Sequence, residues 1–276
     1  MRLAPFKHKI DGSPCWTVNC SRDNIRQPRI SNKGKKILSK YGTEQVGLAA
    51  EIAIADMYSV QIDTDYRKRT STDLINTLTP VLKGFFEAKN IPLPVSHIAL
   101  RKNPVDFLLL NQKTLSVKSN MRSGGKIAPQ NIGQSSSKTF WKRLPGLVDG
   151  FKPEEISYEE SRERFKKLVF DKKEVLLKAY WENLFDTDYM IYVNNVLENN
   201  SDSLTNKPNV FLYEKSQSPD WNKGDLSFSK NITDWNESCT IRYNKISIGE
   251  WQIHNNRDNF KFRFNMPGLI KAKLLR

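Results

Sequence analysis

Asp106 and Lys118 are the two residues whose types and spacing best suit chemistry. They lie in the stretch Pro104 to Asn120, which reads Pro-Val-Asp-Phe-Leu-Leu-Leu-Asn-Gln-Lys-Thr-Leu-Ser-Val-Lys-Ser-Asn. A carboxylate can hold a divalent cation, and an ammonium group beside it can sit next to an attacking water or a phosphate oxygen. The pair therefore suits hydrolysis of a phosphodiester, provided that the fold brings the two side chains together.

The residues between them predict a β-hairpin, the element that would position this pair. Two apolar or β-branched runs flank the polar loop Asn111-Gln112-Lys113. Opposite residues of an antiparallel pair point to the same face, so the acid and the lysine would share one end of one sheet. The alternative is an edge hairpin with a surface ion pair. With Gln112 at the centre of the loop, the expected pairs are Asp106 with Lys118, Leu108 with Ser116, and Leu110 with Thr114.

The same stretch carries a family resemblance. A Pro-x-Asp that begins one strand and an acid-x-Lys that ends the next form the signature of PD-(D/E)xK nucleases, and here the second half is Ser116-Val117-Lys118. The stretch resembles the variant of type II restriction endonucleases in which serine replaces the second acid and a glutamate elsewhere supplies the missing charge. The resemblance covers the chain from about Glu44 to Gln134.

Glu51 is our candidate for that glutamate. It lies in a stretch of high helix propensity that begins near Thr43, a candidate N-cap, and its helical neighbours are small or apolar. A lone buried carboxylate is costly, so Glu51 needs a cation or a donor. The alternatives are that it reaches the rim of this face or pairs with a core arginine. Asp56 and Glu44 are second choices for the same role.

The resemblance implies a mechanism and a partner. Asp106 would ligate Mg2+ together with Glu51 and the carbonyl of Val117, while Lys118 would orient or activate the attacking water. Ser116 occupies the position of an acid without supplying its charge. The expected activity is sequence-specific, Mg2+-dependent cleavage of double-stranded DNA by a homodimer, because two equivalent sites most simply cut both strands of a symmetric site.

The charge of the chain also favours a polyanionic partner. Its 44 Lys and Arg against 30 Asp and Glu give a formal net charge of +14. The stretch after Lys118 mixes glycines with basic and amide side chains that reach base edges and phosphates. A plain polar loop is the alternative reading of this stretch. Our candidate DNA contacts are Arg122, Lys126, Gln130, Asn131, Gln134 and Lys138 in this stretch, with Arg67 and Arg69 as an additional phosphate clamp.

Composition excludes other classes of protein. The histidines at 8, 97 and 254 and the cysteines at 15, 20 and 239 form no zinc-binding pattern. Hydrophobic residues make up 38% of the chain, which is enough for a folded core, yet no apolar run has the length of a membrane span. We expect a protein of the bacterial or archaeal cytoplasm with no membrane partner.

The pattern of elements predicts an α/β fold with a mixed central β-sheet flanked by helices, as in restriction endonucleases. We expect one nuclease domain over residues 1–276, with a basic N-terminal arm (1–42) and a C-terminal antiparallel meander (about 237–276). Helices are expected near Leu74 to Glu87 and, as one long helix or two, within residues 154 to 186. Strands are expected at Tyr189 to Val193 and from Val210.

Two other functions remain open at this point. One is a different nuclease of the same superfamily, which nicks DNA, repairs it or resolves junctions. The other is a DNA- or RNA-binding protein without catalysis, in which the acid and the lysine of the hairpin are structural.

Overall fold

The computed structural model describes residues 29–30, 36–37, 40–99, 103–147, 152, 154–198, 201–254 and 258–275. Contacts divide the chain into two units, Met1–Ser39 and Lys40–Arg276. Most of the predicted basic arm lies outside the described residues, apart from strands β1 (Arg29–Ile30) and β2 (Lys36–Ile37), which pair antiparallel. Within the described ranges, no helix combines the length and the apolarity that crossing a bilayer requires.

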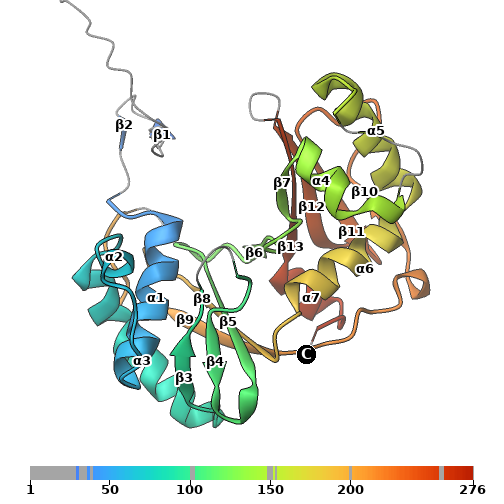
Figure 1. Ribbon diagram of the computed structural model, residues 1–276. Helices are drawn as coiled ribbons and strands as arrows, with labels where there is room; N and C mark the ends of the chain where they lie inside the picture. Colours follow the sequence, from blue (N-terminus) through green and yellow to red (C-terminus); the bar gives the residue numbers. More distant parts are fainter. Residues whose placement is uncertain are drawn as a thin grey trace, which may run out of the picture. The chain divides into compact units, whose positions relative to one another are not determined.

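A five-stranded mixed sheet forms the first half of the larger unit (Figure 1). The strands run in the order β3-β4-β5-β8-β9, and β5 pairs with β8 in parallel while the other neighbours are antiparallel. This arrangement confirms the predicted mixed α/β sheet. The bounds are β3 Pro94–His97, β4 Phe107–Leu109, β5 Thr114–Ser119, β8 Tyr189–Asn194 and β9 Asn209–Glu214.

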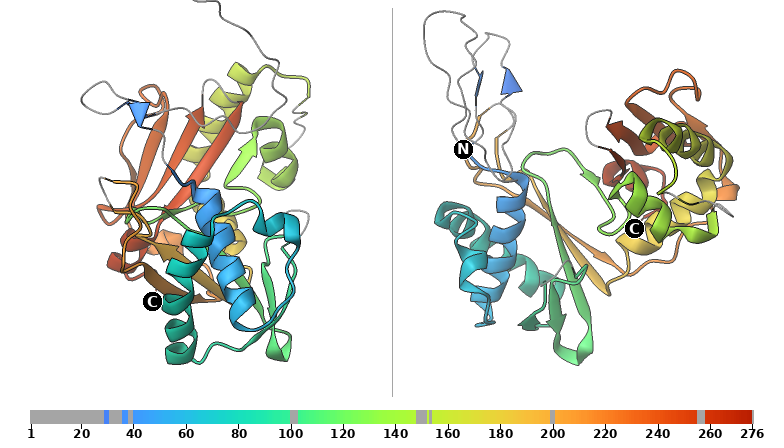
Figure 2. Two further views of the ribbon diagram at one scale, coloured as in Figure 1. Left: turned by 90° about the vertical axis from the view of Figure 1, so that its left-hand side faces the viewer. Right: turned by 45° about the horizontal axis from the view of Figure 1, so that its top comes forward.

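Helices α1 (Thr43–Met57) and α3 (Thr72–Lys89) cover one face of this sheet, and the short α2 (Thr64–Arg67) lies between them in the chain (Figure 2). Helix α3 buries a stripe at every fourth position, Leu74, Leu78, Leu82 and Phe86. These side chains join one apolar cluster with Leu115 and Val117 of β5 and Ile191 and Val193 of β8. The cap of α1 is Gly42 rather than the predicted Thr43, because Gln45 Oε1 accepts the Gly42 N–H (2.9 Å).

The second half of the unit is an antiparallel sheet covered by helices. The predicted helical region 154–186 forms two helices, α5 (Tyr158–Asp171) and α6 (Lys173–Leu184). They pack, together with α4 (Ser137–Arg143), on a sheet of order β10-β11-β12-β13-β6, in which β7 also pairs with β13. The bounds are β10 Leu226–Phe228, β11 Ser238–Tyr243, β12 Ile246–His254, β13 Asn259–Asn265, β6 Lys126–Ile127 and β7 Gln134–Ser136.

This sheet confirms the C-terminal meander and corrects one expectation. Strands β11 to β13 are the predicted meander, and helix α7 (Met266–Lys271) follows them. Strands β6 and β7, however, come from the stretch after Lys118 that we read as a polar loop. The stretch is therefore fastened into the second sheet by pairing with β13, far along the chain.

The hairpin of β4 and β5 forms with a register that differs from the predicted one. Phe107 stands opposite Leu115 and Leu108 opposite Thr114, so the loop is the 3-10 turn Leu110–Gln112, centred on Asn111. Asn111 (φ 66°) and Gln112 (φ 61°) are both left-handed, which moves the centre of the turn by one residue. Each residue of β4 therefore pairs with a residue of β5 two positions earlier than predicted. A shift by an even number of residues keeps every side chain on its face of the sheet.

We expect the left-handed Gln112 to carry a measurable conformational cost. A non-glycine residue in this region is disfavoured by roughly 1 kcal/mol, and a β-branched residue by more. Gln112→Gly should therefore raise the free energy of unfolding by about 0.5 kcal/mol, and Gln112→Val should lower it by about 1 kcal/mol. Urea unfolding of both variants gives the comparison.

Lys113 supplies the control for this measurement, since its φ of −73° is ordinary for any residue. Lys113→Gly should destabilise the protein, because glycine then only adds freedom to the unfolded chain. A destabilising Gln112→Gly would contradict the turn geometry described above.

Candidate active site

Asp106 is buried at the start of the hairpin and is held by the strand that carries Lys118. Its Oδ2 accepts hydrogen bonds from Ser116 Oγ (3.2 Å) and from the Val117 N–H (2.6 Å). Lys118 Nζ lies 3.9 Å from the same oxygen. The structure thus brings Asp106, Ser116 and Lys118 together, although Asp106 neighbours Ser116 more closely than the predicted register implied.

The neighbours of the buried Asp106 carboxylate compensate its negative charge only in part. Burial raises the pKa of Asp106 to about 6; the Lys118 ammonium opposes this rise, and the nearby charge of Glu51 adds to it. The hydrogen bonds from Val117 and Ser116 lower the pKa less than burial raises it. A site with this deficit is stabilised by either a proton or a cation.

Glu51 is buried on α1, and its partners differ from the expected ones. Its Oε2 accepts a hydrogen bond from the Tyr66 hydroxyl (2.7 Å) and lies 3.0 Å from His97 Nε2. The carboxylate therefore neither reaches the rim of the helix face nor pairs with a core arginine. Burial, together with the charge of Glu51, raises the pKa of Tyr66, so its hydroxyl keeps the proton that it donates.

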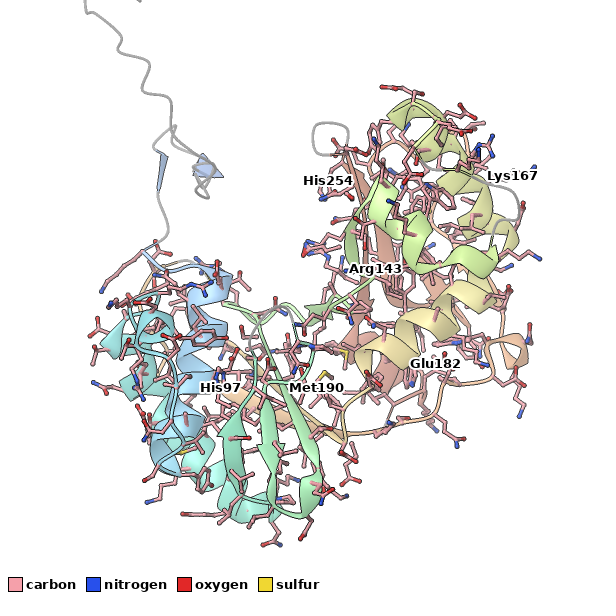
Figure 3. All side chains as sticks on the ribbon, viewed as in Figure 1. His97, Arg143, Lys167, Glu182, Met190 and His254 are labelled. Carbon is pink, nitrogen blue, oxygen red and sulfur yellow. The ribbon has the colours of Figure 1, made fainter. Side chains whose placement is uncertain are left out.

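His97 fixes this arrangement from the edge strand β3. Figure 3 shows His97 between helix α1 and the strands of the first sheet. Its ring contacts Tyr66 and Phe107 edge-on, with centroids 5.0 Å and 5.1 Å away. Since a carboxylate only accepts hydrogen bonds, the contact with Glu51 requires the proton on Nε2.

One cleft of about 430 Å³ joins these groups. Glu51, Asp106 and Lys118 all line it, together with Arg69, Ala128, Pro129, Gln130 and Gln134. Two carboxylates that are far apart in sequence therefore face one cavity. A cation bound by both residues would require such a shared cavity.

Among the candidate DNA contacts, Gln130 and Gln134 line this cleft. Gln130 Oε1 accepts a hydrogen bond from Lys118 Nζ (2.7 Å), and its Nε2 donates to the Asn103 carbonyl (3.1 Å). Gln130 thereby anchors Lys118 in addition to facing the cavity. Gln134 is exposed on strand β7.

The other candidates in this stretch lie outside the lining of the cleft. Arg122 donates to the carbonyls of Glu198 and Ser201, and its guanidinium pairs with Asp202 (3.4 Å). Arg122 is thus held by Glu198, Ser201 and Asp202 of the chain itself. Of the rest, Lys126 pairs with Glu250, the backbone N–H of Asn131 donates to Asn183 Oδ1 (3.2 Å), and Lys138 is exposed on α4.

The two arginines of the expected phosphate clamp also differ in position, because one lines the cleft and the other does not. Arg67 forms an ion pair with Asp56, and neither residue lines the cleft. Arg69 pairs with Glu44, and both line the cleft, where the Arg69 guanidinium lies 5.6 Å from the Tyr66 ring. Arg69 is therefore the better candidate for a phosphate contact.

Sequence reasoning missed Tyr66, His97 and Asn103. A signal existed for His97, because the extended stretch that leads into the hairpin had to lie beside it as a neighbouring strand. We considered the histidines only as zinc ligands, and that test could not find a histidine bonded to a carboxylate. No pattern in the sequence marks Tyr66, which reaches Glu51 from the separate helix α2.

Comparison with known proteins finds a relative of similar sequence. The chain is 29% identical over 236 residues to the type II restriction enzyme CviAII of Paramecium bursaria Chlorella virus 1. The match covers 83% of this chain, which spans 60% of the length of that enzyme. No protein-family model matches the chain, and no solved structure does.

We expect Asp106→Asn to stabilise the metal-free protein. Because the pKa of Asp106 is raised in the folded state, its ionisation lowers stability as the pH rises from about 4 to about 6, and the loss is constant above that. Asparagine is neutral and does not incur this loss. Asp106→Asn should therefore raise the free energy of unfolding by about 1–3 kcal/mol at pH 7.5 and change it little at pH 4. Thermal and urea unfolding with a chelator present measure the difference.

Asp188 offers a matched control on the same sheet. Burial opposes its ionisation, but the hydrogen bonds that Thr114 donates and the charges of Lys113 and Lys215 together outweigh this and lower the pKa of Asp188. Asp188→Asn should therefore destabilise the protein at pH 7.5. If Asp106→Asn destabilised it as well, the Asp106 carboxylate would be better compensated than its surroundings indicate.

Proposed function

We propose that the chain is a site-specific endonuclease of the type II restriction kind, which hydrolyses double-stranded DNA with Mg2+. The observation that carries this proposal is the convergence of Asp106, Glu51 and Lys118 on one cleft of a strongly basic chain. The similarity to CviAII, itself named a type II restriction enzyme, supports it. The site fits the Ser-x-Lys variant of the PD-(D/E)xK pattern, in which Glu51 supplies the charge that Ser116 lacks.

The donors present in the cleft suit Mg2+. They are two carboxylates, and the under-compensated Asp106 favours a cation. The N–H of Val117 points to Asp106. In a β-strand, the carbonyl of a residue points to the same side as its N–H. The Val117 carbonyl is therefore available as a further oxygen ligand. No group of three or more His, Cys, Asp or Glu side chains suited to a metal occurs in the described part of the chain. Mg2+ does not require such a group, because it keeps several of its waters.

Mg2+ bound there would supply charge stabilisation at the phosphate and a more acidic water. The chain's own residues perform the remaining tasks. Lys118, anchored by Gln130, donates a hydrogen bond to the attacking water or to a phosphate oxygen. Ser116 orients Asp106, and Tyr66 with His97 occupy Oε2 of Glu51, which leaves Oε1 for the cation.

We expect Asp106→Ala and Lys118→Ala each to reduce cleavage by a factor of roughly 1,000 or more, because each removes a group from the reacting centre. Glu51→Gln should raise the Mg2+ concentration that cleavage requires. Lys118→Ala should still bind DNA. The assay is digestion of plasmid DNA with Mg2+, followed by sequencing of the ends.

Lys113→Ala is the matched control, because it removes a lysine from the far end of the same hairpin and should leave cleavage unchanged. Full turnover by Asp106→Ala or Lys118→Ala would refute the catalytic assignment. Nicks, or ends at no defined sequence, would favour a nicking, repair or junction-resolving nuclease. DNA binding without any cleavage would favour a non-catalytic DNA-binding protein.

The active species should be a homodimer, since two equivalent sites cut both strands of a symmetric duplex in one encounter. Light scattering of the protein, alone and on a duplex that it cleaves, should give twice the mass of one chain. A particle that stays monomeric on DNA would instead indicate sequential cutting of the two strands.

A further inference from the structure

The antiparallel sheet has one apolar face and one polar face. In β13, Phe260, Phe262 and Phe264 are buried and pack on the aromatic rings of α5 and α6, while Lys261 and Arg263 alternate with them and are half-buried. Strand β12 shows the same alternation around Trp251 and Gln252. The helices cover the apolar face, so this sheet turns a second, polar surface away from its core.

The strand register gathers the polar side chains into a row. Ser238 of β11 stands opposite Gln252 of β12, Gln252 opposite Lys261 of β13, and Lys261 opposite Gln134 of β7. Residues that stand opposite each other point to the same face. Four strands therefore contribute one polar side chain each to a row that crosses the sheet.

This row ends at the candidate active site. Gln134 lines the same cleft as Asp106 and Lys118. The backbone around it is firmly held, because the Phe262 N–H donates to the Gly133 carbonyl (2.9 Å) and β7 pairs with β13. The position of the row relative to the cleft is thus set by strand pairing.

The chemistry of the row suits DNA and does not suit an apolar partner. Amides and a lysine are groups that hydrogen-bond to base edges, and hydroxyls bond to bases and phosphates alike. Beside the row, Glu250 pairs with Arg263 (3.6 Å) and with Lys126, which leaves a net positive charge on this part of the face. An apolar groove would not be bound well by such a set.

We propose that the row Ser238, Gln252, Lys261 and Gln134 is the surface on which this chain reads DNA sequence. The inference rests on the proposed function and adds a recognition surface from the C-terminal sheet to the stretch after Lys118. Strands lie about 4.8 Å apart, so the row spans about 14 Å. At about 3.4 Å per base pair, this length covers about four base-pair steps.

The test measures binding without cleavage. Repeated selection from a randomised duplex library, with wild-type protein and a chelator, gives a preferred duplex, and a shuffled duplex of equal composition serves as reference. Gln252→Ala and Lys261→Ala should each weaken binding to the preferred duplex by about 10-fold or more, as expected for the loss of a base contact. Binding to the shuffled duplex should change less than about threefold.

Lys245→Ala and Gln217→Ala are the matched controls, since both residues are exposed and lie outside the row. Neither should alter the preference for the selected duplex. Equal losses on both duplexes would make the row a phosphate contact and overturn the inference. Unchanged binding by both row variants, or no duplex preferred by the wild type, would overturn it as well.

The result can be separated from the proposed function by adding Mg2+ afterwards. Wild-type protein that discriminates between the duplexes but never cleaves would refute the nuclease and leave the reading surface standing. Site-specific cleavage by row variants that keep full discrimination would refute the reading surface and leave the nuclease standing.

Discussion

The burial of one carboxylate, that of Asp106, is the constraint on which the rest of this site depends. Burial works against its ionisation, and its immediate partners, Ser116 and Val117, are neutral donors from the facing strand. Lys118 supplies the nearby positive charge, and Glu51 adds a second negative charge. The fold therefore concentrates more negative charge than it neutralises at one point, which is the condition for holding a divalent cation.

The hairpin that carries Asp106 was predictable because its signals are local. Apolar or β-branched runs on both sides of a short polar loop indicate two paired strands without reference to the rest of the chain. The predicted register was wrong because Asn111 and Gln112 adopt left-handed conformations. Glycine at these positions would have indicated such conformations more clearly than Asn and Gln do. This error has little consequence for the site, because a shift of two residues keeps every side chain on its face. Only the residue nearest to Asp106 changes, from Lys118 to Ser116.

Long-range contacts set the limit of what the sequence could tell. The charge deficit left by Ser116 and the buried position of Glu51 predicted that Glu51 and Asp106 share a site, and both line one cleft. The partners of Glu51 come from a separate short helix and an edge strand, so no window of sequence contains them together. The same holds for β6 and β7, whose sheet partner β13 lies far along the chain and turns a loop-like stretch into strands.

The partners of the basic candidate DNA contacts indicate how the proposed nuclease would separate affinity for DNA from sequence specificity. Arg122 and Lys126 are bound to Asp202 and Glu250 of the chain itself, whereas the neutral Gln130 and Gln134 face the cleft. A cation close to acidic side chains is drawn to them, whereas a neutral amide gains less from such pairing. In the proposed nuclease, the net charge of +14 would attract any duplex through its phosphates, while discrimination would fall to side chains whose positions strand pairing fixes.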